Sequence, residues 1–534
     1  MKIAAFAAAL AGLAILSACG GGGGGSTGAS AASGLPATIS VTLSASSGSA
    51  SATEGATGVS QTVTATATTT GNLTTPVVAD LSYDKTVYAS VTAVAGTTSG
   101  TYTVTLTPLA NLHGGTYASP VTFRLCQDTA CTQVYAGTTV TYNFALTVVH
   151  DWTTFQGDAA HTGYVHLTLD PSKFVKAWTF VEPDGDPVTP VIAGGGAAFF
   201  SVGTGNKLYS LDEATGAVNW VRNIYADAKA AYPGSAAYAN GKIYVPVGDF
   251  SQPIGGFGAF WVVDAVTGKT ITTWSFQTQL GDPFASPVLQ GGDLFWKNGY
   301  FGETTYRYAL PSGTQVWQTV SPSGAEGAIN MQESSAVDDK YVYYYNYQNV
   351  SIYNRADGTL YAQVGDPSTF TTIYSGYEAP VITASGHVVV SGNWSQVHTV
   401  MAIDPPTKSV AWRSTNNYLL QPAAAGSVIY AGRVSATDSR YATSMDALSD
   451  ADGSLLWSWT MPATDTQLIE NPIVCDNLLF VSTDKATYAV DLTTHQTVWS
   501  TPLHGRLSLS AGGVLYISTS DYGVAGTVTA VKLR

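Results

Sequence analysis

The sequence contains little charge. Only 11% of its 534 residues are charged, and 22 Lys and Arg against 36 Asp and Glu give a formal net charge of −14. The basic residues form no cluster along the chain. Because phosphate backbones and anionic lipid surfaces are bound by grouped Lys and Arg, this composition argues against nucleic acid and anionic membrane surfaces as partners.

Cysteine is also scarce, with four in the whole chain and no two adjacent. Cys126 and Cys131 lie at the two ends of a Gln-Asp-Thr-Ala loop, and this spacing predicts a disulfide across a hairpin of an exported protein. Cys475 ends a Pro-Ile-Val-Cys run and is expected to pack as a small hydrophobic residue.

Several signatures of enzyme chemistry are missing. The sequence contains no H-E-x-x-H motif, no G-x-S-x-G motif and no phosphate-binding glycine loop. Its eight histidines form no convincing set of metal ligands, and the nearest pair is His161 and His166. The sequence therefore predicts no metal site and no catalytic residue.

The chain begins with features of an export signal. An apolar run from Ile3 to Ile15 follows Lys2, and Leu16-Ser17-Ala18-Cys19 matches the cleavage motif of bacterial lipoproteins. The run is too short to cross a membrane as a helix. We therefore expect residues 1–18 to be a signal peptide and Cys19 to carry lipid. An ordinary secretory signal with an incidental cysteine is the alternative.

A glycine- and serine-rich stretch follows at residues 19–35, and its lack of apolar periodicity predicts a flexible linker. Gly20, beside the lipidated cysteine, favours sorting to the outer membrane, with the chain facing the periplasm or the cell surface. The expected partners are the membrane, through the N-terminal lipid, and other envelope proteins.

Residues 36–149 are predicted to form a separate module. Apolar and polar residues alternate with period two, the pattern of half-buried strands, and there is almost no helix signal. About seven short strands in this length indicate an immunoglobulin-like β-sandwich. The seven expected strands lie around 39–43, 63–67, 77–81, 87–91, 102–106, 121–125 and 140–146. A spacer is the expected role, with glycan or protein binding as the alternative.

The rest of the chain repeats one phrase. In Leu208–Trp220 a strand leads to a tight turn from Asp212 to Gly216 and a second strand reaches Trp220. We expect Asp212 to cap the turn, Gly216 to take positive φ, and Trp220 to pack between neighbouring repeats. These roles are structural.

The equivalent turn positions are 216, 268, 313, 358, 408, 453 and 495, which are 52, 45, 45, 50, 45 and 42 residues apart. The tryptophans of later repeats are Trp317, Trp412, Trp457 and Trp499. Some copies depart from the pattern: Trp274 is displaced by two residues, Ala362 replaces the Trp, and Lys408 and His495 replace the Gly. Four short strands in about 45 residues are typical of one β-propeller blade.

An eighth repeat is divided between the two ends of this region. Arg506–Val531 supplies three strands, and the missing strand that ends in Trp can come from Phe174–Trp178. Sharing one blade would remove the open seam of a ring and its unpaired edges. The sequence therefore predicts an all-β protein whose residues 150–534 form an eight-bladed propeller, with seven blades as the alternative.

The repeat resembles the quinoprotein-type, or pyrroloquinoline-quinone-like (PQQ-like), propeller repeat, and Trp152–Gly163 resembles the lead-in segment of such propellers. The family includes quinone-dependent dehydrogenases, which would imply PQQ with calcium as cofactors. It also includes the lipoprotein of the outer-membrane barrel-assembly machine, which binds no quinone. An adjacent cysteine pair, which many quinone enzymes place against the cofactor, is absent from this chain.

One group of charged residues remains as a candidate site. Alignment of the repeats places Glu333, Glu378, Glu470 and Arg506 at equivalent positions, just before the innermost strand of each repeat. Around a central channel they would bind a cation or a polar ligand. Alternatively, they are solvated or paired with one another.

These observations favour a non-enzymatic lipoprotein that binds proteins through its propeller, as in outer-membrane protein assembly, and needs no cofactor. The alternative is a PQQ-dependent dehydrogenase-like enzyme with its site at the central channel.

Overall fold

The computed structural model describes residues 37–53, 58–73, 75–109, 112, 114–202, 206–224, 231–249, 257–277, 286–298, 304–320, 334–345, 349–365, 379–391, 399–435, 440–519 and 525–534. The predicted signal peptide, Cys19 and the linker lie outside these residues. No helix in the described part of the chain is long and apolar enough to cross a membrane. The regular elements of the described residues are strands, as predicted, apart from one short 3-10 helix at Pro171–Lys173.

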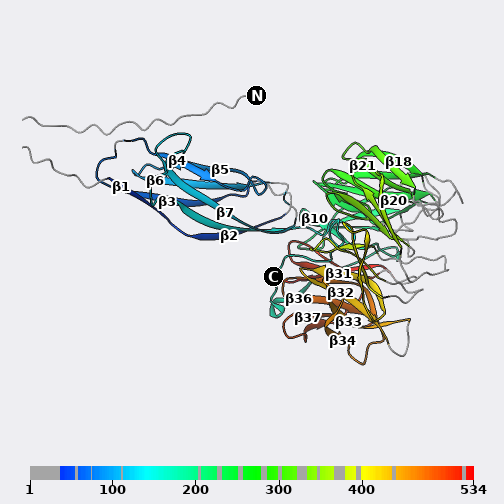
Figure 1. Ribbon diagram of the computed structural model, residues 1–534. Coiled ribbons are helices and arrows are strands. Elements are labelled where there is room, and N and C mark those ends of the chain that lie inside the picture. The colour runs from blue at the N-terminus through cyan, green and yellow to red at the C-terminus, as the bar shows by residue number, and fades with distance from the viewer. Residues whose placement is uncertain are drawn as a thin grey trace, which may run out of the picture.

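The first module consists of two four-stranded sheets that pack face to face around one core (Figure 1). One sheet has the order β1 (Thr38–Leu43), β3 (Gln61–Thr70), β6 (Thr101–Pro108), β5 (Tyr88–Ala95). The other has the order β2 (Ser47–Thr53), β8 (Val140–Val149), β7 (Gly115–Cys126), β4 (Val78–Ser82). Phe123, Phe144 and Leu106 are among the most buried side chains of this core.

β2 is absent from the sequence-based expectation. Its sequence, Ser-Gly-Ser-Ala-Ser-Ala-Thr, contains no large apolar residue, so it gives no alternating hydrophobic signal. It pairs in parallel with β8, from Ser47 opposite Asn143 to Thr53 opposite Val149. At the end of β7 the sulfurs of Cys126 and Cys131 are bonded, with Cα atoms 5.1 Å apart. This separation is normal for a disulfide.

Eight further sheets, counted over the described residues, follow in chain order, and we call them blades 1 to 8. Blades 1 to 4 contain β10 (Ile192–Gly194), β11 (Ala197–Val202), β12 (Lys207–Asp212), β13 (Val218–Asn223); β14 (Ala231–Pro233), β15 (Ala237–Ala239), β16 (Lys242–Asp249), β17 (Phe257–Asp264), β18 (Thr270–Gln277); β19 (Val288–Gln290), β20 (Asp293–Asn298), β21 (Thr304–Ala309), β22 (Thr314–Val320); and β23 (Ala336–Val337), β24 (Tyr341–Tyr345), β25 (Asn349–Asn354), β26 (Leu360–Gly365). Blades 5 to 8 contain β27 (Val381–Ile382), β28 (Val388–Val390), β29 (Met401–Asp404), β30 (Ser409–Arg413); β31 (Tyr418–Ala425), β32 (Val428–Val434), β33 (Ala442–Ser449), β34 (Leu455–Thr460); β35 (Leu468–Val474), β36 (Leu478–Thr483), β37 (Thr487–Asp491), β38 (Thr497–Thr501); and β39 (Arg506–Leu509), β40 (Val514–Thr519), β41 (Thr527–Lys532), β9 (Val175–Val181).

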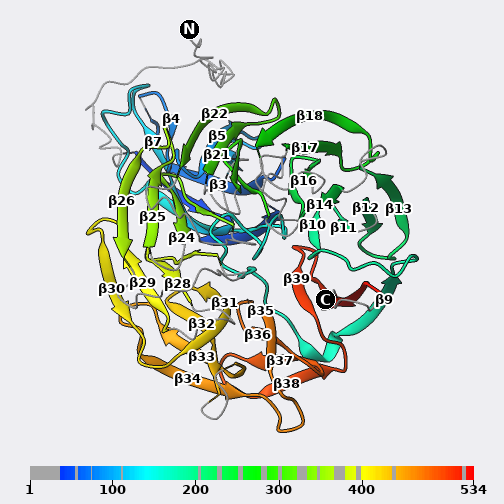
Figure 2. The same ribbon diagram turned by 90° about the vertical axis from the view of Figure 1, so that its right-hand side faces the viewer.

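Figure 2 shows the blades arranged around a common centre. Their inner strands lie next to one another in circular order, β10, β15, β19, β23, β27, β31, β35 and β39, and β39 lies next to β10 again. β9 pairs antiparallel with β41, so that Thr527 lies opposite Val181 and Ala530 opposite Trp178. The strand expected from Phe174–Trp178 is therefore the fourth strand of the last sheet.

The repeated turns join each blade to the one before it. Gly216 has φ +72°, and a Cβ atom placed on it would lie 2.5 Å from the ring of Trp178 in blade 8. The carbonyl oxygen of Glu213, in the same turn, accepts a hydrogen bond of 2.9 Å from Trp178 Nε1. Trp220, Trp317 and Trp412 donate in the same way to the carbonyls of Ala265, Arg355 and Asp450 in the following blades.

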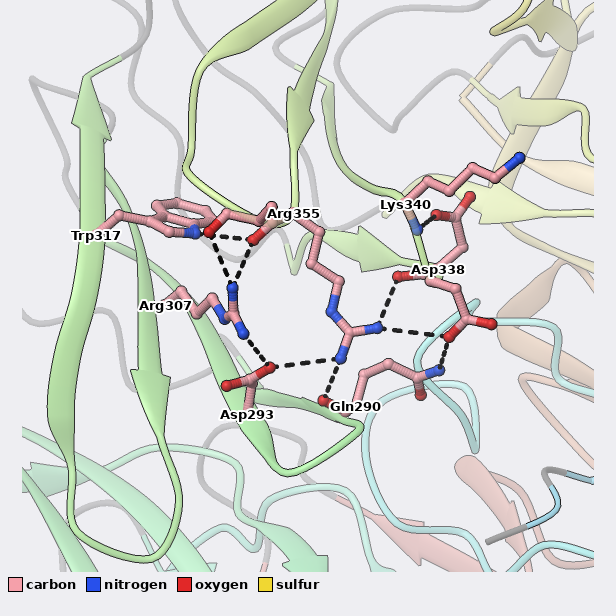
Figure 3. Close-up of polar contacts among 9 residues, drawn as sticks. Gln290, Asp293, Arg307, Trp317, Asp338, Lys340 and Arg355 are labelled. Carbon is pink, nitrogen blue, oxygen red and sulfur yellow. Dashed lines mark hydrogen bonds and ion pairs between the residues drawn. The ribbon is translucent and has the colours of Figure 1, made fainter.

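Three of these carbonyl-bearing residues also reach back into the preceding blade with a charged side chain. Figure 3 shows one such contact, in which Arg355 of blade 4 lies 3.4 Å from the buried carboxylate of Asp293 in blade 3. Arg307, also of blade 3, approaches the same carboxylate at 2.9 Å. Asp450 of blade 6 accepts hydrogen bonds from Ser385 Oγ at 2.6 Å and lies 3.0 Å from His387 Nδ1, both in blade 5. Since Ser385 bonds to the carboxylate and not to the imidazole, this Ser-His-Asp group is an inter-blade contact and not a nucleophile with its base.

Candidate binding site at the central channel

The lead-in segment runs across the centre of the ring and bonds to the blades around it. Residues 152–165, which we call the plug, run from blade to blade and accept hydrogen bonds from the inner-strand amides. In the described residues the bonds of 2.8–2.9 Å go from Ala193 to Trp152, Tyr238 to Thr153, Val337 to Ala159, Ile382 to Ala160, Ala424 to Thr162 and Val474 to Gly163. These donors belong to blades 1, 2, 4, 5, 6 and 7, and the plug therefore holds the inner strands in one register.

Three side chains of the plug bind carbonyl groups of prolines. Thr154 Oγ1 donates to Pro287 O at 2.7 Å in blade 3, and Gln156 Nε2 donates to Pro422 O at 3.2 Å in blade 6. His161 Nδ1 lies 3.2 Å from Pro380 O in blade 5. All three side chains are at most 1% exposed. The polar groups that the sequence places in this loop thus satisfy backbone carbonyls inside the ring.

A second layer of polar residues connects neighbouring inner strands just beside the plug. Ser334 Oγ donates to Ser286 O at 2.8 Å, between blades 4 and 3. Gln421 Nε2 donates to Ala379 O at 3.1 Å, between blades 6 and 5. Asn471 Nδ2 donates to Leu507 O at 3.3 Å, between blades 7 and 8, and also binds Gln156 Oε1. We call these residues the polar girdle.

The four predicted channel residues each precede a residue of the girdle in the sequence. Glu333 and Glu378 lie outside the described residues. Glu470 lies in β35, but its side chain is outside the described part, and Arg506 begins β39 with a half-buried side chain. The structure therefore places these two backbone positions beside the girdle, and the cluster of three carboxylates and one guanidinium stays a prediction.

Two inner strands bulge at this level. The pairing of β31 with β32 shifts between Leu419 and Ala423, and the pairing of β35 with β36 shifts between Ile469 and Ile473. Leu420, inside the first bulge, has φ +74°. A bulge redirects side chains and is frequent near binding sites. Glu470 lies inside the second bulge, so its backbone is set apart from the regular strand.

His161 in the plug and His166 just after it bind different partners. Burial lowers the pKa of His161 to about 4, so its imidazole is neutral at pH 7. His166 Nδ1 lies 3.0 Å from Tyr164 Oη and 3.6 Å from the Asp476 carboxylate. His161 and His166, the pair considered from the sequence, therefore contact different groups. Among the described residues, Asp80, Cys126 and Cys131 are close enough to one another for a metal, but the two sulfurs are bonded together.

Sequence reasoning missed most of the residues that organise this centre. The segment Trp152–Gly163 was recognised by its resemblance, but nothing in it indicated that Thr154, Gln156 and His161 bind three blades. A usable signal is the recurrence of Pro at one position of the inner strands, at Pro287, Pro380, Pro422 and Pro472. A proline has no N–H to donate, but its carbonyl remains available to a side chain.

The fold is similar to that of a solved quinohemoprotein alcohol dehydrogenase. A quinohemoprotein alcohol dehydrogenase, ADHIIG from Pseudomonas putida HK5, is 13% identical, with 72% of this chain and 80% of that chain covered and a TM-score of 0.51. The quinohemoprotein alcohol dehydrogenase from Comamonas testosteroni is 14% identical over the same shares, with a TM-score of 0.39. Apo AztD from Citrobacter koseri is 11% identical, covers 68% of this chain and 94% of that one, and has a TM-score of 0.37. At 13% identity, the similarity to ADHIIG shows the fold alone.

The described residues do not fit a quinone site at the plug. The polar atoms of Thr154, Gln156 and His161 that face the inner strands are already bonded to proline carbonyls. The comparison with curated proteins gave no match. The sequence family described as outer membrane protein assembly factor BamB matches residues 169–414 and 302–534, which together span more than half of the chain. The resemblance to a PQQ-like propeller is thereby confirmed, and the chain belongs to this family.

Proposed function

We propose that the protein is a non-enzymatic lipoprotein of the cell envelope whose propeller is a protein-binding scaffold in outer-membrane protein assembly. The observation that carries the proposal is the plug, whose carbonyls and side chains bind seven of the eight described blades. A centre that is filled by the chain itself gives a rigid ring. Such a ring suits the presentation of a binding surface, and the description of the family supports assembly as the process.

The proposed organisation has four parts. Residues 1–18 are a signal peptide, 19–35 a linker, 36–149 an immunoglobulin-like sandwich that acts as a spacer, and 150–534 a closed eight-bladed propeller. Lipid on Cys19 anchors the chain to the outer membrane, where it faces the periplasm or the cell surface. The circular order of the inner strands and the pairing of β9 with β41 support the closed ring.

The alternative is a PQQ-dependent dehydrogenase-like enzyme with its site at the channel. It is favoured by the fold shared with ADHIIG. Titration of the purified protein with PQQ and calcium, followed by assays of alcohols and sugars with an artificial electron acceptor, separates the two functions. Stoichiometric binding of the quinone together with turnover would establish the enzyme.

Assembly is tested by the abundance of outer-membrane β-barrel proteins in a strain that lacks this chain. The proposal expects lower amounts of folded barrels, measured by their heat-modifiable migration, and recovery with the wild-type gene. The Cys19→Ser variant, which keeps the ring but lacks the anchor, is the matched control and should recover less. Unchanged barrel levels in the deletion strain would reject a role in assembly.

A further inference from the structure

His150 lies at the joint between the sandwich and the propeller. It directly follows β8, the last strand of the sandwich, and it is 7% exposed. Its ring contacts a glycine of each module. A Cβ atom placed on Gly114, next to β7 of the sandwich, would lie 2.7 Å from His150 Cδ2. One placed on Gly157 of the plug would lie 3.3 Å from His150 Cε1. The imidazole is therefore packed against both modules.

Both ring nitrogens of His150 face backbone carbonyl groups. Nδ1 lies 3.0 Å from Asp151 O, and Nε2 lies 2.7 Å from Tyr164 O in the plug. A carbonyl oxygen can only accept a hydrogen bond, and a neutral imidazole has only one N–H group. In the neutral form, one of the two contacts would place a lone pair against an oxygen. Only the imidazolium, which has two N–H groups, satisfies both carbonyls.

A carboxylate of the plug lies close to this ring. Asp158 Oδ2 is 3.7 Å from His150 Nε2, and Asp158 Oδ1 accepts a hydrogen bond of 2.9 Å from the Thr162 N–H group. The other histidine near Asp158 is His161, which is neutral at pH 7 because burial lowers its pKa to about 4. His150 is therefore the cation that faces this carboxylate, and a nearby negative charge favours the charged imidazole.

The remaining ionisable group beside His150 is its neighbour in the sequence, Asp151. Its Oδ2 accepts a hydrogen bond of 3.3 Å from Gly195 N in blade 1. On the side of the sandwich the described contact is Gly114, which has no ionisable side chain. Loss of a proton from His150 would thus remove a bond at the joint and separate Asp158 from its cation.

We propose that a doubly protonated His150 fixes the sandwich to the plug, and that this joint loosens when the imidazolium loses a proton. Because both carbonyls and the carboxylate bind the charged form, the folded joint keeps this proton to a higher pH than a free histidine, which titrates at about pH 6.5. The contribution of the joint is complete at low pH and is lost as the pH rises. The joint is independent of the proposed function.

The protonation state tests the first half of the proposal. The full-length Cys19→Ser protein is labelled with ¹⁵N-histidine, and the His150 signals are assigned by their loss in His150→Gln. They should show a proton on both ring nitrogens at pH 7.5. His504→Gln, which changes a histidine between β38 and β39, is the matched control and should leave these signals unchanged. A neutral His150 at pH 7.5, in either tautomer, would overturn the proposal.

The freedom of the sandwich relative to the ring tests the second half. Spin labels on Thr66→Cys and Val498→Cys, at exposed positions of β3 and β38, report the distance between the two modules. The native Cys475 is buried and stays unlabelled in the folded protein. The distance distribution should be narrow at pH 6 and should broaden as the ¹⁵N signals show the loss of the His150 proton. In His150→Gln it should be broad at pH 6 as well. A width that does not follow the proton, or a narrow distribution in His150→Gln, would contradict the proposed joint.

Discussion

Trp178 Nε1 donates a 2.9 Å hydrogen bond to the carbonyl oxygen of Glu213, and this bond connects the last blade to the first. The carboxylate of Glu213 accepts two more bonds from blade 8, from Ser510 Oγ at 3.0 Å and from Tyr516 Oη at 3.1 Å. One residue therefore makes three contacts across the closure of the ring. Closure by side chains adds to the pairing of β9 with β41.

The turn glycine beside Trp178 provides a first prediction. Gly216→Ala should destabilise the protein through positive φ, about 1–2 kcal/mol, and through a Cβ only 2.5 Å from the indole, which adds about 1 kcal/mol or more. Gly196→Ala is the matched control, because Gly196 has φ +79° but open space around its Cβ. Thermal unfolding compares the two variants, and equal losses would contradict packing of Trp178 against Gly216.

The closure contact should depend on pH. Burial raises the pKa of Glu213, and the nearby Asp151 and Asp212 raise it further, while the bonds from Ser510 and Tyr516 oppose the shift. Because the folded pKa lies above the unfolded one, the folded protein holds this proton more tightly, and stability falls as the pH rises from the unfolded pKa through the folded pKa. The Glu213→Gln variant lacks this loss. The melting temperature of wild type minus that of Glu213→Gln should decrease between pH 4 and pH 7, and a constant difference would contradict it.

The ring could be predicted from sequence because its repeats carry local signals. The turn of Gly216 and the indole of Trp220 have a pattern of their own, and each recurs about every 45 residues. The departures from the repeat also have structural roles. The imidazole of His495, which replaces the turn glycine, stacks on the indole of Trp457 with ring centroids 4.3 Å apart. Lys408, which replaces another turn glycine, places its ammonium group over the ring of Tyr361. The sequence shows each such replacement in its own blade but not the residue of the neighbouring blade that it contacts.

The centre could not be predicted because its contacts are not local. The carbonyl that Gln156 binds lies 266 residues further along the chain, and Asn471, which also binds Gln156, lies 315 residues further along. No spacing rule connects such positions. β2 was missed for another reason: its small residues have no hydrophobic period, and it is held by its backbone pairing with β8. The candidate carboxylates Glu333 and Glu378 lie outside the described residues and stay predictions.

The bond between Cys126 and Cys131 should stabilise the sandwich only modestly. It closes a short loop, so the chain-entropy estimate is roughly 2 kcal/mol. Changing both cysteines to alanine should lower the melting temperature of the sandwich. Thiol titration of the unfolded Cys19→Ser protein, purified from the periplasm, should detect Cys475 alone. Three reactive thiols in that protein would show that the bond does not form.

Cys19 is predicted to anchor the chain. Because the lipid is attached through this sulfur, Cys19→Ser should move the protein from the membrane fraction to the soluble periplasmic fraction while the ring stays folded. Fractionation followed by immunoblotting measures the change. A variant that remains in the membrane fraction would argue against lipidation at this residue.

The most direct test of the scaffold is affinity purification of the tagged, lipid-anchored protein from detergent-solubilised envelopes, with an untagged strain as the control. We predict that proteins of the outer-membrane barrel-assembly machinery are enriched in amounts comparable to the bait, and that the bait carries no quinone. Recovery of the bait without any envelope protein, together with bound PQQ that turns over an alcohol, would contradict a scaffold function.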